Sequence, residues 1–181
     1  MPTSSLPPLK VIGVVQTQFQ DRGHTPIQAA LNPDDEGVVV LEERYSEALE
    51  GLQSFDYLWL LTWLGEDPQG EPALRQVPFL LQRDGREMGI LATRGPRRIN
   101  PIGLSLVRLV GINGLEIRFA GVDLLDGTPV VDIKPFVARF DRPSGAIRSG
   151  WFDTVPIRRG DTPARLRPSG WGDRSPGDPQ S

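Results

Sequence analysis

The stretch of residues 88–137 constrains the fold most, because it combines strand patterning with a tight-turn signal. Residues 104–112 and 115–122 carry the apolar alternation and β-branched content of strands, and Asn113-Gly114 lies between them. An Asn-Gly pair is typical of a two-residue hairpin turn with positive φ at both central positions. We therefore expect an antiparallel hairpin whose outer ends meet at one rim of a sheet.

Polar clusters flank this hairpin. Three arginines precede it within five residues, at positions 94, 97 and 98. Pro96 and Pro101 stiffen the segment, so the guanidinium groups have restricted directions. Such a fork suits a carboxylate or a phosphate, although a solvated basic rim explains the same spacing. The hairpin geometry is expected to bring Arg94 towards Asp126 in the acidic cluster that follows.

The rest of the chain adds more short strands and little helix. We expect strands at residues 9–19, 37–42, 55–64, 77–82, 88–93 and 129–133, and a short helix at 45–52. Residues 55–64 are nearly continuously apolar, which favours a fully buried strand. No G-x-G-x-x-G fingerprint follows any strand, which argues against a Rossmann fold. The predicted fold is mainly β: a small antiparallel β-barrel with one or two short helices and a flexible C-terminal tail.

Composition excludes several kinds of chemistry. The chain has no cysteine and one histidine, His24, so disulfides, thiolate zinc sites, cysteine nucleophiles and multi-histidine metal sites are excluded. No 18-residue apolar run and no secretory signal are present. We expect a cytoplasmic protein with no metal and no membrane partner. Its chemistry has to come from carboxylates, arginines, backbone groups and a bound cofactor.

The ends of the chain differ from its centre. We expect a flexible segment at 1–8, the barrel domain at 9–155, and a disordered Arg/Pro/Gly-rich tail at 156–181. Residues 142–181 hold seven arginines against four aspartates, a net charge of +3, whereas the remainder of the chain carries −6. These arginines fit a solvated tail or an RNA-contacting arm equally well. Trp151, Phe152 and Val155 are candidates to dock on the barrel.

Two motifs in this chain resemble a known family. Residues 93–105 read Thr93-Arg-Gly-Pro-Arg-Arg-Ile-Asn-Pro-Ile-Gly-Leu-Ser105, and residues 123–136 read Asp123-Leu-Leu-Asp-Gly-Thr-Pro-Val-Val-Asp-Ile-Lys-Pro-Phe136. They resemble the T-R-S-P-x-R-P-N-P-I-G-L-S and D-x-x-D-G-T-P-x-x-D-I-K-P-Y signatures of the TrmO (TsaA-like or YaeB-like) family. Members are S-adenosylmethionine-dependent methyltransferases that act on threonylcarbamoyladenosine in tRNA. The resemblance covers about residues 11–155.

The resemblance implies an S-adenosylmethionine cofactor, a tRNA partner and a homodimer. It assigns Arg94 to the methionine end of the cofactor and leaves Arg97 for the substrate. The implied cofactor-binding residues are Pro26, Ile27, Gln28, Gly65, Glu66, Arg94, Leu104, Leu124, Leu125, Asp126 and Gly127. The implied substrate-binding residues are Arg97, Asn100, Asp132 and Lys134.

Methyl transfer to the N6 nitrogen of an acylated adenine benefits from a carboxylate that accepts its proton. We assign Asp126 to this catalytic role, with Asp132 as the fallback. Asp132 and Lys134 alternate with apolar neighbours, so their side chains are expected on one face. There they form either a structural ion pair or part of a substrate wall.

Four of the departures of this chain from the family pattern bear on the activity. Gly95 replaces a serine, Ile99 a proline, Ile27 an arginine, and Gly65 stands where the family has a histidine. Two alternatives to a tRNA methyltransferase therefore stay open. One is a module that binds S-adenosylmethionine without turnover, and the other is a small-molecule methyltransferase on the same barrel.

Overall fold

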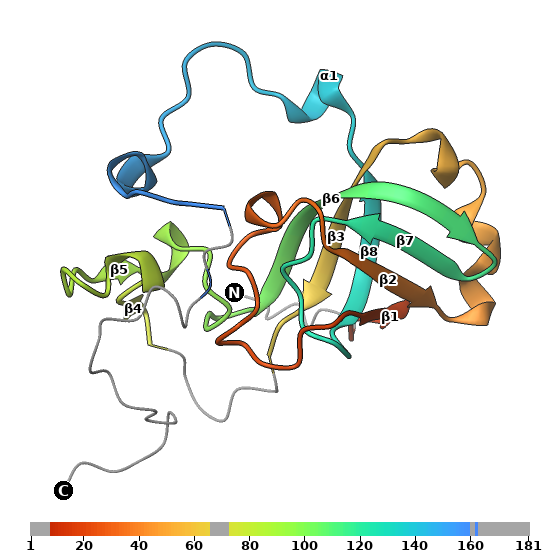
Figure 1. Ribbon diagram of the computed structural model, residues 1–181, viewed down its shortest axis with the longest axis horizontal. Helices are drawn as coiled ribbons and strands as arrows, with labels where there is room; N and C mark the ends of the chain where they lie inside the picture. Colours follow the sequence, from red (N-terminus) through yellow and green to blue (C-terminus); the bar gives the residue numbers. More distant parts are fainter. Residues whose placement is uncertain (1–7, 66–72, 160–161, 163–181) are drawn as a thin grey trace, which may run out of the picture.

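Six antiparallel strands close into a barrel (Figure 1). The computed structural model describes residues 8–65, 73–159 and 162. The strand order around the barrel is β1-β2-β7-β6-β3-β8. The bounds are β1 (Gly13–Gln16), β2 (Glu36–Leu41), β3 (Tyr57–Trp63), β6 (Ile102–Asn113), β7 (Glu116–Ala120) and β8 (Pro129–Pro135). The predicted small antiparallel barrel is confirmed.

Regular structure outside the barrel is short. Two strands, β4 (Arg75–Gln76) and β5 (Met88–Gly89), form a separate two-stranded sheet. The α-helix α1 (Ala138–Asp141) has a single turn, and the other helical segments are 3₁₀ turns. These turns are η1 (Ala29–Leu31), η2 (Glu43–Leu49), η3 (Leu52–Ser54), η4 (Phe79–Leu81), η5 (Ile90–Ala92) and η6 (Gly150–Thr154). Among the described residues, no helix is long and apolar enough to cross a membrane.

The barrel core comes from alternate residues of its strands, as the period of two requires. Phe119 of β7 is the largest fully buried side chain, and Leu58 and Leu60 of β3 are equally inaccessible. The other core residues are small and mostly β-branched, which suits the narrow interior of a six-stranded barrel. They include Val15, Val39, Val107, Ile117, Val122 and Val130.

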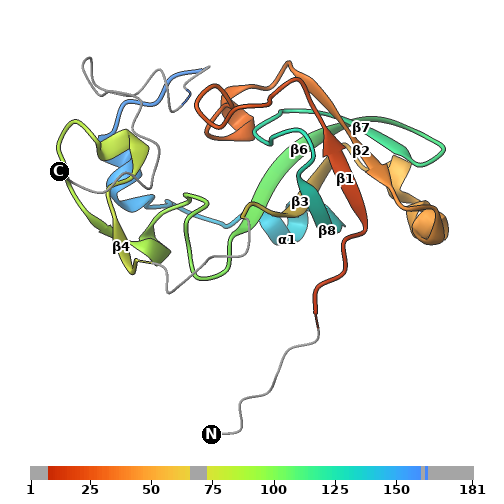
Figure 2. The same cartoon turned by 90° about the horizontal axis from the view of Figure 1, so that it is seen from below.

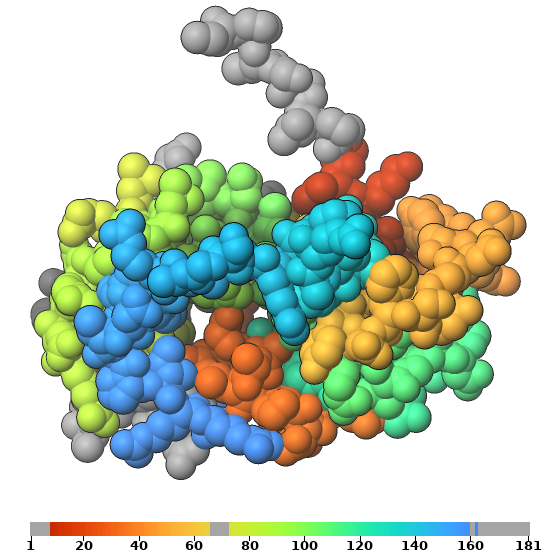
Figure 3. Space-filling model, turned by 90° about the horizontal axis from the view of Figure 1, so that it is seen from above, coloured from red at the N-terminus to blue at the C-terminus, as the bar shows by residue number. Residues whose placement is uncertain are grey.

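Residues 73–98 form a second unit beside the barrel, which we call the lobe (Figure 2). It contains β4, β5, η4 and η5, and it buries Leu81 and Ile90 away from the barrel core. Residues 142–159, which we call the strap, run along it (Figure 3). The indole N–H of Trp151 donates to the carbonyl oxygen of Ala92 at 2.7 Å. Trp151 was expected to dock on the barrel; it docks on the lobe instead.

The hairpin turn differs from its prediction by one residue. Strand β6 extends to Asn113, which pairs with Glu116, so the two turn residues are Gly114 and Leu115. Gly114 has φ of 57°, and no described residue other than glycine has a positive φ. One positive φ at the first turn position needs one glycine, and Asn113 is free to stay extended. The hairpin was predicted correctly, and its turn type was not.

The apolar segment at 55–64 is a strand, as predicted, but it is not buried on both faces. Leu58 and Leu60 point into the barrel, whereas Tyr57 and Trp59 lie on its outer face. The two aromatic rings lie 6.4 and 6.1 Å from that of Phe136, in edge and tilted arrangements. The outward-facing aromatic residues of β3 pack against another aromatic ring on the outer face of the barrel. This is why the segment is apolar at nearly every position although only one face is fully buried.

The strands predicted at 77–82 and 88–93 are wrong over most of their length. Pro78 precedes a 3₁₀ turn in which the Leu81 N–H donates to the Pro78 carbonyl at 2.9 Å. Residues 90–92 turn in the same way, and pairing is limited to β4 with β5. The apolar residues here pack into the core of the lobe and do not form strand pairs. The helix expected at 45–52 is present as η2 and η3.

Candidate functional site

A pocket of about 350 Å³ opens on the outer face of β3 and β6. Its apolar wall comes from Trp59, Leu104 and Leu106. Its polar groups, Arg94 and Asp123, come from the two sequence clusters that flank the hairpin. The predicted meeting of those clusters at one rim is therefore observed. Further lining residues are Gln28, Ala29, Ala30, Pro33, Tyr57, Ser105, Arg108, Ala120 and Gly121.

Asp123 joins three segments at the floor of this pocket. The Ser105 hydroxyl donates to one carboxylate oxygen at 2.7 Å, and the Ala29 N–H donates to the other at 2.9 Å. Burial raises the pKa of Asp123 above its ordinary value, while these two bonds and the Arg94 guanidinium act in the opposite direction. Asp123 therefore fixes the loop of η1 against β6, and it becomes a candidate proton acceptor that the sequence did not suggest.

Arg94 stands where the lobe meets the barrel. Its guanidinium donates to the Leu104 carbonyl at 3.4 Å. Its positive charge partly offsets the effect of burial, which still leaves the pKa of Asp123 raised. The backbone before it is anchored by Thr93, whose hydroxyl donates to the Ile90 carbonyl at 2.8 Å and accepts from the Gln76 amide at 2.6 Å. Arg94 thus shares its pocket with Asp123, whereas Asp126, towards which the hairpin geometry is expected to bring it, is not among the lining residues.

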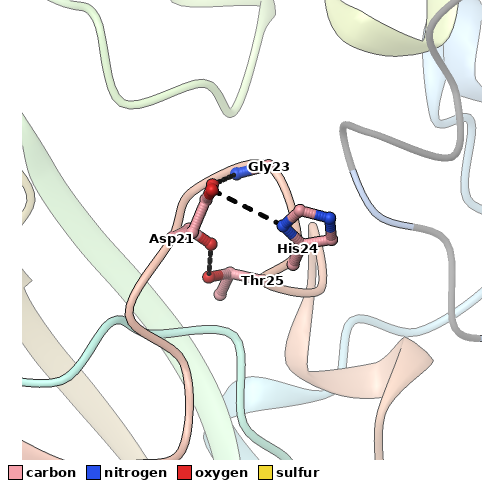
Figure 4. A network of polar contacts seen from close by, with 4 residues as sticks. All are labelled: Asp21, Gly23, His24 and Thr25. Carbon is pink, nitrogen blue, oxygen red and sulfur yellow. Dashed lines mark hydrogen bonds and ion pairs between the residues drawn. The ribbon is translucent and has the colours of Figure 1, made fainter.

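The loop before η1 reaches the pocket through Gln28, whereas Pro26 and Ile27 are not among the lining residues. The turn at Asp21 shapes this loop (Figure 4). The Asp21 carboxylate accepts the Gly23 N–H, and the Thr25 hydroxyl donates to the Asp21 carbonyl at 2.7 Å.

His24 belongs to the same turn. Its imidazole lies 3.5 Å from the Asp21 carboxylate, and its side chain is 77% exposed. The interpretation of His24 as a solvated loop residue agrees with this position, which is outside the pocket lining.

The segment 124–127 uses its backbone groups within the fold. The Leu124 carbonyl accepts from the Thr17 hydroxyl at 3.1 Å, and the Asp126 and Gly127 N–H groups donate to the Phe19 and Val15 carbonyls. Leu124 itself is a core residue. Residues 124–127, Leu125 included, do not line the pocket. Their predicted contact with a cofactor stays a prediction.

Asp126 is an exposed side chain with two partners on the first loop. Its carboxylate accepts the Thr17 N–H at 3.1 Å. A hydrogen bond from Gln20 and this N–H lower the pKa of Asp126. A carboxylate with a lowered pKa is a weaker base. Both its position and its pKa favour a role in bracing the loop.

The four substrate-binding candidates lie apart from the pocket lining. Lys134 and Asp132 pair at 2.8 Å on the outer face of β8, and Asp132 raises the pKa of Lys134. Their shared face was predicted correctly. Arg97, near the end of the lobe, and Asn100, between the lobe and β6, are both exposed.

Gly65 follows β3 and packs against Pro101. A β-carbon at Gly65 would lie 2.9 Å from the Pro101 Cγ, so a larger side chain requires this loop to move. The Leu64 N–H donates to the Pro101 carbonyl at 2.7 Å and holds the two segments together. Glu66, the neighbouring candidate, lies outside the described residues.

Asp123 and Ser105 are site residues that the sequence analysis left without a role, although both belong to the quoted motifs. Asp123 follows directly on an apolar strand end, which was the available signal. Trp59 was interpreted as core, and it forms a pocket wall instead. The pocket therefore offers an apolar surface, the guanidinium groups of Arg94 and Arg108, and the partly buried carboxylate of Asp123. This set suits a ligand that is part aromatic and part charged.

The family profile of the tRNA-methyltransferase O N-terminal domain matches residues 14–142. The chain belongs to this family. The match contains the whole pocket lining and both flanking clusters, so the resemblance to the TrmO family is confirmed.

Relatives within the family carry related names. A protein of Pyrococcus abyssi named "Probable S-adenosyl-L-methionine-binding protein" is 37% identical over 78% of this chain and 74% of its own length. The tRNA (adenine(37)-N6)-methyltransferase of Escherichia coli is 36% identical over 70% of this chain and 56% of its own. The chain thus spans about three quarters of the first relative and little more than half of the second.

Solved TrmO structures share the fold. The crystal structure of TrmO from Pseudomonas aeruginosa superimposes with a TM-score of 0.63 and 34% sequence identity. The superposition covers 80% of this chain and 62% of the TrmO chain.

Proposed function

We propose that the protein transfers a methyl group from S-adenosylmethionine to the N6 nitrogen of adenine 37 in tRNA, the activity in the names of its E. coli and human relatives. The observation that carries this proposal is that Arg94 and Asp123, which belong to different family motifs, line the same pocket. Membership of the family supports it further.

The pocket fits S-adenosylmethionine in chemistry. Trp59 and Leu106 offer apolar and aromatic surface for an adenosine group, and Arg94 offers a fork for the carboxylate of the methionine part. A volume of about 350 Å³ lies at the small end of ligand pockets. When bound, S-adenosylmethionine supplies a methyl group activated by its sulfonium. The protein then has to orient the acceptor and remove its proton.

We assign proton removal to Asp123 in place of Asp126. Asp123 lines the pocket and has a raised pKa, which makes it the stronger base of the two. The Ser105 hydroxyl and the Ala29 N–H each occupy one carboxylate oxygen. Each oxygen keeps a second lone pair for the N6 proton. Arg97 and Asn100, which are exposed and follow Arg94 along the chain, remain the proposed contacts to the substrate.

We also propose a homodimer. Tyr57, Ile102 and Leu104 on the outer face of β3 and β6 are 42%, 43% and 47% exposed. They continue the apolar wall of the pocket, so a second copy packed here would close the pocket from outside. Light scattering at micromolar concentration tests this: a monomer would contradict it. The location expected of an enzyme that acts on tRNA is the cytoplasm.

A second candidate is a module that binds S-adenosylmethionine without turnover. The observation that favours it is Gly65, which places no side chain where the family has a histidine and which has no space for one beside Pro101. Arg94 and the apolar wall would still hold the cofactor. A small-molecule methyltransferase would need the same pocket with a different acceptor.

One experiment separates these functions. The protein is mixed with S-adenosylmethionine labelled in its methyl group and with total tRNA, and label in RNA is counted. Transfer to tRNA that Asp123→Asn abolishes supports the proposal. Binding of the cofactor without transfer supports the second candidate, and transfer only to small metabolites supports the third.

A further inference from the structure

Charge divides the molecule into two halves. The lobe holds six arginines against two acidic residues, net +4, and the strap holds four against one, net +3. The remaining described residues, 8–65 and 99–141, hold seven basic against fourteen acidic side chains, net −7. The overall charge of −3 is therefore unevenly distributed. The lobe and strap together carry +7, and the remaining described residues carry −7.

Most of the basic charge has no acidic partner. Arg83, Arg86, Arg97 and Arg148 are exposed, and within the described chain none of them makes an ion pair or a side-chain hydrogen bond. Glu87 is the acidic residue of the lobe that pairs, with Arg75 at 3.1 Å. Such a concentration of like charge repels itself in the free protein and is relieved by an anionic partner.

The strap is attached to the lobe close to the pocket. Trp151 attaches the strap to the lobe through Ala92, two residues before Arg94. Arg94 itself belongs to the pocket lining. Figure 3 shows the strap and lobe around a hollow that faces the loop of residues 25–35. A polyanion lying on the lobe would thus reach the pocket entrance, while the acidic barrel repels it elsewhere.

The cations of the lobe and strap are all arginines, and neither segment contains a lysine. The planar guanidinium binds phosphate oxygens in pairs and also stacks on bases. We propose that the lobe and strap form the face that holds the phosphate backbone of RNA and directs one nucleotide into the pocket. This rests on the proposed function, because it names the surface on which the tRNA substrate lies.

The test removes two lobe charges that are not among the pocket-lining residues. The variant Arg83→Gln/Arg86→Gln is compared with Lys10→Gln/Arg44→Gln, which removes the same charge from exposed positions on the barrel side. Binding to an unmodified tRNA transcript is measured by fluorescence anisotropy over a potassium chloride series. We expect the lobe variant to lose about tenfold in affinity and its salt slope to fall by about 1.5, for two lost phosphate contacts. The control should stay within about twofold.

Further readouts distinguish this inference from the proposed function. Cofactor affinity, measured by titration, should be the same in both variants, which shows that the pocket is intact. Unchanged tRNA affinity in the lobe variant, with methyl transfer to tRNA intact, overturns the inference and leaves the function standing. Equal losses in both variants also overturn it, because overall charge would then explain binding. Binding to phosphatidylserine vesicles in place of tRNA would assign the face to a membrane and overturn it as well.

Discussion

The barrel and the lobe differ in the size of their cores and in the sign of their charge. The barrel encloses eleven buried core residues and carries an excess of acidic groups on its surface. The lobe buries Leu81 and Ile90, pairs two residues on each of two strands, and exposes unpaired arginines. The pocket lies where the two meet: the lobe contributes Arg94, and the barrel side contributes Asp123 and Arg108.

Core deletions should show the largest difference between the two regions. Phe119→Ala is expected to lower the free energy of unfolding by about 3–5 kcal/mol, because the narrow barrel cannot close the resulting cavity. Leu81→Ala should loosen the lobe and leave the barrel transition in place. Hydrogen exchange with mass spectrometry measures both. If Leu81→Ala also accelerated exchange across β3 and β7, the two regions would be a single cooperative unit.

Replacement of Asp123 sharpens the comparison at the pocket. Asp123→Asn is expected to reduce kcat/KM about 100-fold or more, the usual contribution of a general base. In the wild type, activity falls as the pH falls through the raised pKa of Asp123, so the acidic limb lies above its ordinary value of 3.8. The limb should vanish in Asp123→Asn and persist in Asp126→Asn.

The same raised pKa links Asp123 to stability. Between pH 3.8 and the raised value, the folded chain holds a proton that the unfolded chain has lost. Asp123 therefore makes the wild type less stable as the pH rises through that window. A denaturant series with Asp123→Asn measures this: the variant should lack that loss, and an identical pH dependence would refute it.

Arg94 tests the lobe's contribution to the cofactor. Arg94→Ala is expected to weaken S-adenosylmethionine binding by about 1.5–3 kcal/mol, the range for a hydrogen bond to a charged group, or about ten- to a hundredfold. Arg94→Lys should restore little if the contact is bidentate. Arg97→Ala, three residues on, is the matched control and should alter transfer only. Calorimetric titration decides, and unchanged affinity in Arg94→Ala would remove it from the cofactor site.

The smallest effect is expected at the strap. Trp151→Phe removes the indole N–H that donates to Ala92 and keeps the ring next to Phe152, with which it stacks at 3.8 Å. The loss of one hydrogen bond is expected to weaken docking of the strap by about 0.5–1.5 kcal/mol. Limited proteolysis should then cut near residue 147 faster than in the wild type. Equal rates would mean that Trp151 does not anchor the strap.

The sequence predicted the barrel because its strands follow local rules. Alternation and β-branched residues predicted β2, β6, β7 and β8, the continuous apolar run at 55–64 predicted β3, and the glycine-containing turn predicted the hairpin. The strand prediction failed in the lobe because residues 77–82 are apolar enough for a strand. Their hydrophobicity serves a separate small core, and Pro78 starts a turn there. A short apolar segment does not reveal which core it fills.

The site was partly predictable for a similar reason. Arg94 was identified with the pocket because it lies in a dense motif, and Leu104 and Gln28 also line the pocket. Asp123 was quoted and given no role, since its importance depends on Ala29, 94 residues away, and on Ser105. Burial of a charge is a property of the assembled barrel, and no local pattern encodes it.

The barrel closes through a short seam. Strands β3 and β6 share seven residue pairs, whereas β1 and β8 share two, and one of these involves Pro129, which has no N–H to donate. A barrel that opens does so first where its ladder is shortest. Detachment of β1 would leave β8 and β2 as free edges, ready to accept a strand from another copy. The short pairing between β1 and β8 therefore predicts that molecules exchange strands at high concentration.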